Sequence, residues 1–205
     1  MPNSKVTLSA AFVSDGTQPE PVPADNEQFV DVPKDSYFHD AVYWAVDKAM
    51  TEGVDSTHFA PNGKCTRAQM VTFLWRAAGK PAPASAENPF TDVAADAYYH
   101  DAVLRAVEKG ITVGTRSTTF SPDAVVTRGQ SVTFLYRYMG EETQTENPFV
   151  DVTESDYFYQ PVLWAAASDV TQGTDKTHFS PKADCTRSQI VTFIYRAASD
   201  PTDLR

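Results

Sequence analysis

Three copies of the pattern Thr-Arg-x-Gln constrain the fold of this chain more than any other feature. They lie at residues 66–69, 127–130 and 186–189, each just ahead of an apolar run. A Thr followed three residues later by a Gln is the signature of a capping box, in which the two side chains bond main-chain amides at the start of a helix. Each copy therefore predicts the first turn of a helix, and the chain is predicted to be a repeat protein.

The Arg inside each capping box is not explained by the cap. Arg67, Arg128 and Arg187 occupy the first helical position, where the helix dipole is positive and a cation loses roughly 0.3–1 kcal/mol. Either a carboxylate of the protein neutralises each Arg, or the guanidinium groups and helix N-termini are held for anions from outside the chain. The sequence leaves both interpretations open.

A second motif, Phe-x-Asp-Val, recurs with the same period. It lies at residues 29–32, 90–93 and 149–152, so the repeat is about 60 residues long and should bury its apolar face against its neighbours. An aromatic pair then opens an amphipathic stretch, residues 38–49 in the first copy, that predicts a helix. In the third copy Pro161 fits only the first turn of a helix, which predicts a later start there.

A loop with a constant pattern follows this first helix. Gly53, Gly114 and Gly173 are expected to end the helices in the left-handed conformation. A Phe-x-Pro sequence comes six residues after each Gly, and its Phe is expected to fill the core while its Pro fixes the turn. The recurring carboxylates of the Phe-x-Asp-Val motif are interpreted as closing a turn before a helix; they are Asp31, Asp92 and Asp151.

Composition and charge argue against some classes of function. No stretch approaches the roughly 20 apolar residues of a membrane span, and a net charge of −10 argues against nucleic acid as the main partner. The N-terminus lacks the features of a signal peptide, so a protein working outside the cell would be a piece of a longer precursor. Residues 1–28 combine a strand-like segment with a Pro-rich spacer, which predicts the end of an upstream module and its linker.

The two cysteines, Cys65 and Cys185, directly precede the Thr-Arg pair, where the second repeat has Val126. A position that accepts Val is most simply a buried apolar one. A disulfide would need the two Cα atoms within about 7 Å, which sequence cannot establish. His58 and His178 are near them in sequence, but the spacing matches no zinc pattern, so neither a metal nor a cofactor is predicted.

The combination of Phe-x-Asp-Val, an aromatic-led helix, Gly-x5-Phe-x-Pro and Thr-Arg-x-Gln, three times over, resembles the S-layer homology (SLH) domain. The resemblance covers residues 29 to about 198 and divides the chain into repeats at 29–80, 90–140 and 149–199. It implies a mainly all-α fold of three helix-loop-helix repeats. These would form a monomeric pseudo-threefold trimer, with one helix of each repeat in a central three-helix bundle, three prongs, and ligand grooves between neighbours.

The resemblance also implies a function. SLH domains anchor proteins non-covalently to secondary cell-wall polysaccharides of bacteria, commonly pyruvylated ones, and the Arg of the Thr-Arg motif meets the ketal carboxylate. Arg67, Arg128 and Arg187 occupy that position here, and the loops after Gly53, Gly114 and Gly173 would be groove walls. The chain is therefore expected to be an extracellular, non-catalytic module that anchors a bacterial surface protein to the cell wall.

The second repeat departs from the others. It has Arg105 where they have Trp44 and Trp164, and Arg116 where they have Asp55 and Asp175. A Trp offers a flat face to a sugar ring, so the grooves are not expected to be equivalent; the competing interpretation places both Trp residues in the core. Two rival functions are a protein-interaction module of the envelope and an accessory domain of a secreted enzyme whose catalytic part lies upstream.

Overall fold

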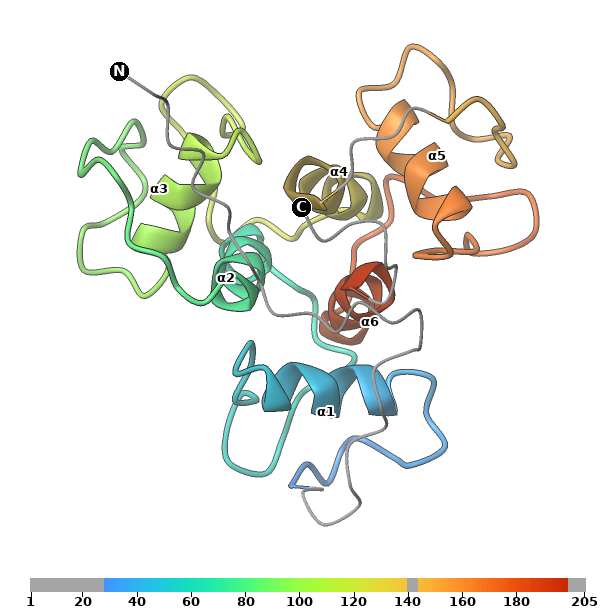
Figure 1. Cartoon of the computed structure of the whole chain (residues 1–205), viewed down its shortest axis with the longest axis horizontal. Helices are drawn as coiled ribbons and strands as arrows, with labels where there is room; N and C mark the ends of the chain where they lie inside the picture. The colour runs from blue at the N-terminus through green and yellow to red at the C-terminus, as the bar shows by residue number, and fades with distance from the viewer. Residues whose placement is uncertain (1–27, 140–143, 199–205) are drawn as a thin grey trace, which may run out of the picture.

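The fold is a ring of three helical repeats, seen in a computed structural model that describes residues 28–139 and 144–198. The expected upstream strand and spacer therefore lie almost entirely outside the described residues. Within those ranges there are six helices and no strands longer than an isolated bridge: α1 (His39–Asp47), α2 (Arg67–Ala77), α3 (His100–Glu108), α4 (Arg128–Met139), α5 (Tyr159–Ala167) and α6 (Arg187–Ala198). Figure 1 shows α2, α4 and α6 at the centre and α1, α3 and α5 around them. The predicted bundle with three prongs is confirmed.

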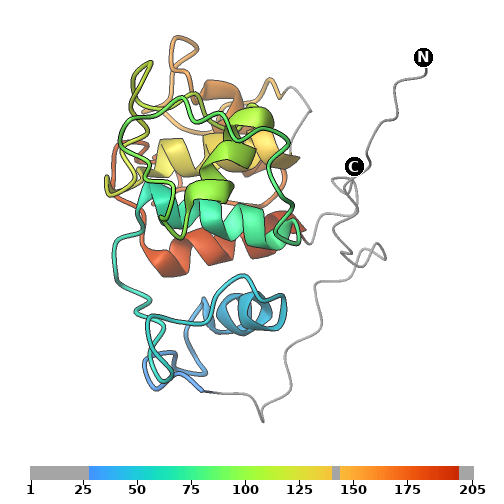
Figure 2. The same cartoon turned by 90° about the vertical axis from the view of Figure 1, so that its left-hand side faces the viewer.

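Each outer helix packs on the central helix of another repeat. α3 lies against α2, α5 against α4, and α1 returns to α6, while α4 contacts both other central helices. Figure 2 shows α1 on the outside of the bundle beside α6. A unit of about 60 residues is near the lower limit for a core of its own, and here the three units share one core by passing a helix to the preceding neighbour.

Main-chain hydrogen bonds close the ring near its centre. Cys65 N–H donates to Cys185 O, Cys185 N–H to Val126 O, and Val126 N–H to Cys65 O, each at 2.9 Å. All three side chains are fully buried. The interpretation of this position as a buried apolar one is confirmed.

The first helices end earlier than predicted. α1 ends at Asp47, and the left-handed residue that follows it is Ala49, with φ of 52°. Its counterparts are Gly110 and Asp169. The prediction that Gly53, Gly114 and Gly173 end these helices is therefore wrong. Their φ angles of 83–87° belong to the loop beyond.

Those glycines support the buried Phe of the Phe-x-Asp-Val motif. A Cβ built on Gly53 would lie 2.5 Å from Cε1 of Phe29 and 2.6 Å from the carbonyl oxygen of His58. Phe29 in turn packs on Phe59, the loop Phe, with ring centroids 6.0 Å apart. Phe59, Phe120 and Phe179 are completely buried, which confirms the prediction that they fill the core.

The third repeat keeps the register of the others despite its proline. α5 begins at Tyr159, the counterpart of His39 and His100. Pro161 lies in its first turn, where the missing N–H would have no helical partner. The predicted later start is wrong, because the first turn already accommodates the ring.

Candidate functional site

The capping boxes form as predicted, in all three repeats. Thr66 Oγ1 accepts from Gln69 N–H at 3.2 Å, and Gln69 Oε1 accepts from Thr66 N–H at 3.1 Å. The same two bonds recur between Thr127 and Gln130 and between Thr186 and Gln189. The helix starts are therefore local products of the sequence.

The amides of the first turn are not open to a ligand. Arg67 N–H donates to Ala124 O at 2.9 Å and Ala68 N–H to Pro122 O at 3.0 Å, both in the loop of the next repeat. α4 and α6 are capped in the same way by the loops of the third and first repeats. The expectation that free helix N-termini would bind an anion is thus corrected. Carbonyls of a neighbouring repeat satisfy these donors, and the guanidinium group remains.

Each of these Arg side chains is buried against the next repeat. Arg67 Nε donates to Phe120 O at 2.9 Å, and the guanidinium carbon lies 4.8 Å from the Phe120 ring centroid and 5.2 Å from that of Phe134. The same contacts recur for Arg128 with Phe179 and Phe193, and for Arg187 with Phe59 and Phe73. Cation–π contacts and one main-chain hydrogen bond hold each cation.

One end of the guanidinium is left without a partner. Arg67, Arg128 and Arg187 are 3%, 4% and 5% exposed. Nη2 of Arg67 and of Arg187 is buried with no hydrogen-bond acceptor, whereas Nη2 of Arg128 donates to Thr171 Oγ1 at 3.4 Å. A buried charged donor that lacks a partner is costly. Nη2 of Arg67 and Nη2 of Arg187 are thus donors that could still form a hydrogen bond to an added acceptor.

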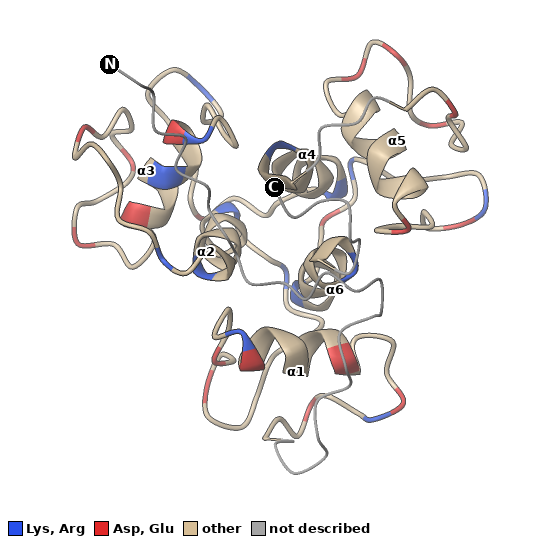
Figure 3. Cartoon of the chain, in the orientation of Figure 1, with Lys and Arg blue, Asp and Glu red and all other residues tan. Residues whose placement is uncertain are grey.

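No carboxylate of the described residues forms an ion pair with these three arginines. Burial lowers the pKa of Arg67, and Tyr157 and Asp92 oppose this at longer range. Figure 3 shows that the central helices carry Arg and no acidic residue, while Asp and Glu lie on the outer helices and the loops. Of the two interpretations of the Arg, neutralisation by a protein carboxylate in contact is not realised.

A Tyr from the remaining repeat lies within electrostatic range of each Arg. Burial raises the pKa of Tyr157, and Arg67 opposes this. Burial lowers the pKa of Arg128 and of Arg187, and Tyr37 and Tyr98, respectively, oppose this. These tyrosines are 61–63% exposed. Each site thus joins an Arg of one repeat, the Phe-x-Pro loop of the next and a Tyr of the remaining one. The sequence pattern predicted only that the aromatic pair containing this Tyr begins a helix. The recurrence of the Tyr in all three repeats was the feature that could have pointed to it.

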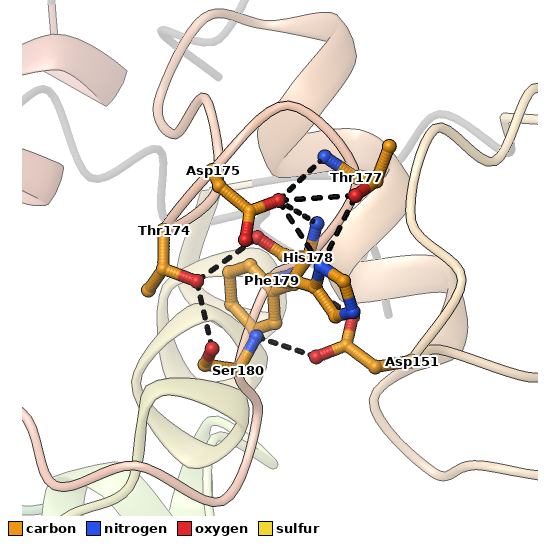
Figure 4. A network of polar contacts seen from close by, with 7 residues as sticks. All are labelled: Asp151, Thr174, Asp175, Thr177, His178, Phe179 and Ser180. Atoms are coloured by element: carbon orange, nitrogen blue, oxygen red, sulfur yellow. Dashed lines mark hydrogen bonds and ion pairs between the residues drawn. The ribbon is translucent and has the colours of Figure 1, made fainter.

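The Phe-x-Asp-Val carboxylates position the loop that receives the Arg. Asp151 accepts from Phe179 N–H at 2.9 Å and Ser180 N–H at 2.8 Å, as Figure 4 shows. Asp31 and Asp92 make the same pair of bonds in their repeats. The interpretation that these residues close a turn before a helix is wrong, because each carboxylate reaches a loop 28 residues further on.

Asp55 and Asp175 are used within their own loops. Asp175 Oδ1 accepts from Thr177 N–H at 2.8 Å and from His178 N–H at 2.9 Å (Figure 4). The bond from Thr177 is the main cause that lowers the pKa of Asp175 to about 2. Asp55 has the same bonds and the same pKa. Both carboxylates order the loop, chiefly through Oδ1.

The two Trp residues lie in the core. Trp44 is 4% exposed and meets Tyr195 edge-on with ring centroids 5.5 Å apart, and Trp164 is 2% exposed and meets Tyr136 at 5.7 Å. Neither ring offers a face to a sugar in this structure. Burial between outer and central helices supports the competing interpretation, in which both Trp residues belong to the core.

Within residues 28–139 and 144–198, no group of three or more His, Cys, Asp or Glu is placed to hold a metal ion. None of the helices in that part is both long and apolar enough to cross a membrane.

Comparison with known proteins identifies the repeats. The family model of the S-layer homology domain matches residues 28–71, 89–130 and 148–191. A cell surface protein of Thermoanaerobacter kivui is 33% identical over 119 residues, which are 55% of this chain and 16% of that protein. The surface-layer 125 kDa protein of Lysinibacillus sphaericus is 29% identical over 197 residues, 93% of this chain and 16% of that protein.

An endoglucanase of a Bacillus species is also similar, 30% identical over 110 residues, or 53% of this chain and 12% of the enzyme. The chain thus spans only a small part of each of these relatives. The family model, in contrast, covers more than half of the chain, once in each structural repeat. The chain belongs to the S-layer homology domain family and carries three copies of the domain.

Proposed function

We propose that this chain anchors a bacterial surface protein to the cell wall by binding an acidic polysaccharide at Arg67, Arg128 and Arg187. The observation that carries the proposal is the buried guanidinium whose Nη2 has no acceptor, at Arg67 and Arg187. A carboxylate is the partner that such a donor suits best, through a short charge-assisted hydrogen bond. The ligand is a non-reacting one, so the chain acts as a binding module and not as an enzyme.

The surroundings of each Arg favour a carboxylate carried on a sugar. The exposed tyrosine beside each guanidinium offers a flat apolar face with a polar hydroxyl at its edge, which suits a sugar ring. A pyruvate ketal places one carboxylate directly on such a ring. We therefore propose a pyruvylated secondary cell-wall polysaccharide as the ligand, with the main-chain amides of the helix playing no direct part.

The relatives support a place on the bacterial envelope. Two of them are surface-layer or cell surface proteins, and the present chain matches a small part of each, as an attached module would. The similar endoglucanase favours a second arrangement, in which the same anchor serves a secreted enzyme. The binding chemistry is the same in both arrangements.

Removal of two of these cations is expected to abolish attachment. In the variant Arg67→Gln/Arg187→Gln, co-sedimentation with purified cell walls should fall at least about tenfold, because each charge-assisted hydrogen bond contributes roughly 1.5–3 kcal/mol. Retained binding by the folded variant would contradict the proposal.

A matched control lies at the other end of the same two helices. Arg76 and Arg196 each donate one bond to a main-chain carbonyl, of Met50 and Val170. Arg76→Gln/Arg196→Gln removes the same charge and should leave binding unchanged. Circular dichroism and thermal melts of both variants separate loss of binding from loss of fold.

A further inference from the structure

The two cysteines face each other across the junction between the first and last repeats. An antiparallel bridge pairs Lys64 with Thr186, so the next residues along, Cys65 and Cys185, are directly opposite. The bond from Cys65 N–H to Cys185 O at 2.9 Å confirms this pairing. Cys185 N–H donates to Val126 O rather than back to Cys65, so the pair shares one bond. Backbones paired side by side lie about 4.7–4.9 Å apart, which is within the roughly 4.4–6.8 Å Cα separation of a disulfide.

Their side chains also share one face. Along an extended segment successive side chains alternate between faces. Lys64 and Asp184 form an ion pair on the exposed side, and the two residues that follow them, Cys65 and Cys185, are both completely buried. Both thiols therefore point toward the centre of the ring. They are free in this structure.

The two cysteines lie at the junction between the third repeat and the first. The chain itself joins the first repeat to the second and the second to the third, and only the junction of the third with the first has no covalent link. Of the three equivalent central positions, the one occupied by Val126 belongs to the repeat with a chain connection on both sides. We propose that Cys65 and Cys185 form a disulfide that closes the ring covalently.

This junction also holds one of the ligand sites. Arg187 Nε donates to Phe59 O across it, and α1 packs on α6 there. Opening of the junction would therefore separate the two halves of the Arg187 site. A bond between Cys65 and Cys185 would keep them together, whatever ligand the site binds.

Disulfide formation needs an oxidant, and the oxidant needs transient access to the two buried thiols. One cysteine thiolate attacks a small-molecule disulfide such as oxidised glutathione and releases one thiolate, and the second cysteine then displaces the other. In sum, the two thiols lose two electrons and two protons, and the small disulfide is reduced to two thiols. Burial raises the pKa of Cys65 to about 12 and of Cys185 to about 11. The reaction is therefore expected during folding, before the junction closes.

The test is refolding of the protein with oxidised glutathione, compared with refolding under reducing conditions. The oxidised product should be monomeric, lack two hydrogen atoms in its intact mass, and show no titratable thiol after denaturation. Its thermal midpoint should rise by on the order of 10 °C, because the bond closes a long loop. Two titratable thiols after oxidative refolding, or only intermolecular dimers, would overturn the proposal.

The second repeat supplies the control residue. Cys65→Val/Cys185→Val places at both positions the side chain that the equivalent Val126 already has in the same surroundings. This variant should fold and should show the same thermal midpoint after both treatments. If it gained the same increase from oxidising conditions, the increase would not come from the disulfide and the proposal would fail.

Discussion

At the scale of single residues, the loops of the three repeats differ in how they should respond to acid. Hydrogen bonds from main-chain amides lower the pKa of Asp55 and Asp175 from 3.8 to about 2. The second repeat has Arg116 at this position and keeps the Thr115 hydroxyl bond to Thr119 O, a bond whose counterpart Thr174 makes in the third repeat. One chain therefore contains two acid-sensitive loops and an internal control.

We expect the two Asp loops to lose order only in strong acid. A carboxylate whose folded pKa is depressed contributes stability above its unfolded value, and that contribution disappears as the pH falls through the folded value. The amide signals of Thr57 and Thr177 should therefore shift as the pH falls from about 4 to about 1, with a midpoint of about 2, while that of Thr118 stays in place. NMR titration measures this. A midpoint near 3.8 would show that the carboxylates are not held as described.

The sequence singled out three Arg residues but did not predict their surroundings. The oddity of a cation at the first helical position pointed to Arg67, and the structure explains it by a carbonyl and two Phe rings from another repeat. None of these is close in sequence, so no local pattern contains them. The role of Trp44 was ambiguous for the same reason. Its position in the sequence predicts on which face of the helix it lies, but only the packing of the whole chain decides whether another helix buries that face.

At the scale of elements, two glycine substitutions separate the effect of close packing on stability from the effect of backbone conformation. Gly53 and Gly79 both have positive φ, of 87° and 80°, but only Gly53 has atoms in the way of a Cβ. Gly79→Ala should destabilise the protein by about 1–2 kcal/mol through the left-handed conformation alone. Gly53→Ala should cost at least twice as much, because the Phe29 ring must also move. Denaturant unfolding compares the two. Equal costs would mean that the Phe29 contact is unimportant.

The starts of the three central helices were predictable, and the ends of the outer helices were not. The capping box is local, so Thr66 and Gln69 indicate the start of α2 within one turn. The end of α1 depends on Ala49, which adopts the left-handed conformation without being a glycine. The Asp31 carboxylate was assigned to a nearby turn because its partners, the amides of Phe59 and Ala60, are in a distant loop. The Asp31 bonds are thus long-range, whereas the end of α1 is closed locally, by the bond from Met50 N–H to Ala45 O.

At the scale of the whole molecule, the sequence predicted three repeats in one domain but not which helices would pair. The structure closes the ring by packing α1 on α6, and every proposed ligand site draws on all three repeats. Loss of one repeat would therefore damage more than its own Arg. The proposed anion binding is compatible with a net charge of −10, because the central helices carry Arg and no acidic residue, while Asp and Glu lie on the outer helices and the loops (Figure 3).

The most direct test of this account is a calorimetric titration of the intact chain with purified secondary cell-wall polysaccharide, native and chemically depyruvylated. We predict binding of the native polymer, weakened by salt as expected for a charge-assisted contact, and at least about tenfold weaker binding once the carboxylates are removed. Equal affinity for the two polymers would contradict the assignment of Arg67, Arg128 and Arg187 as carboxylate sites.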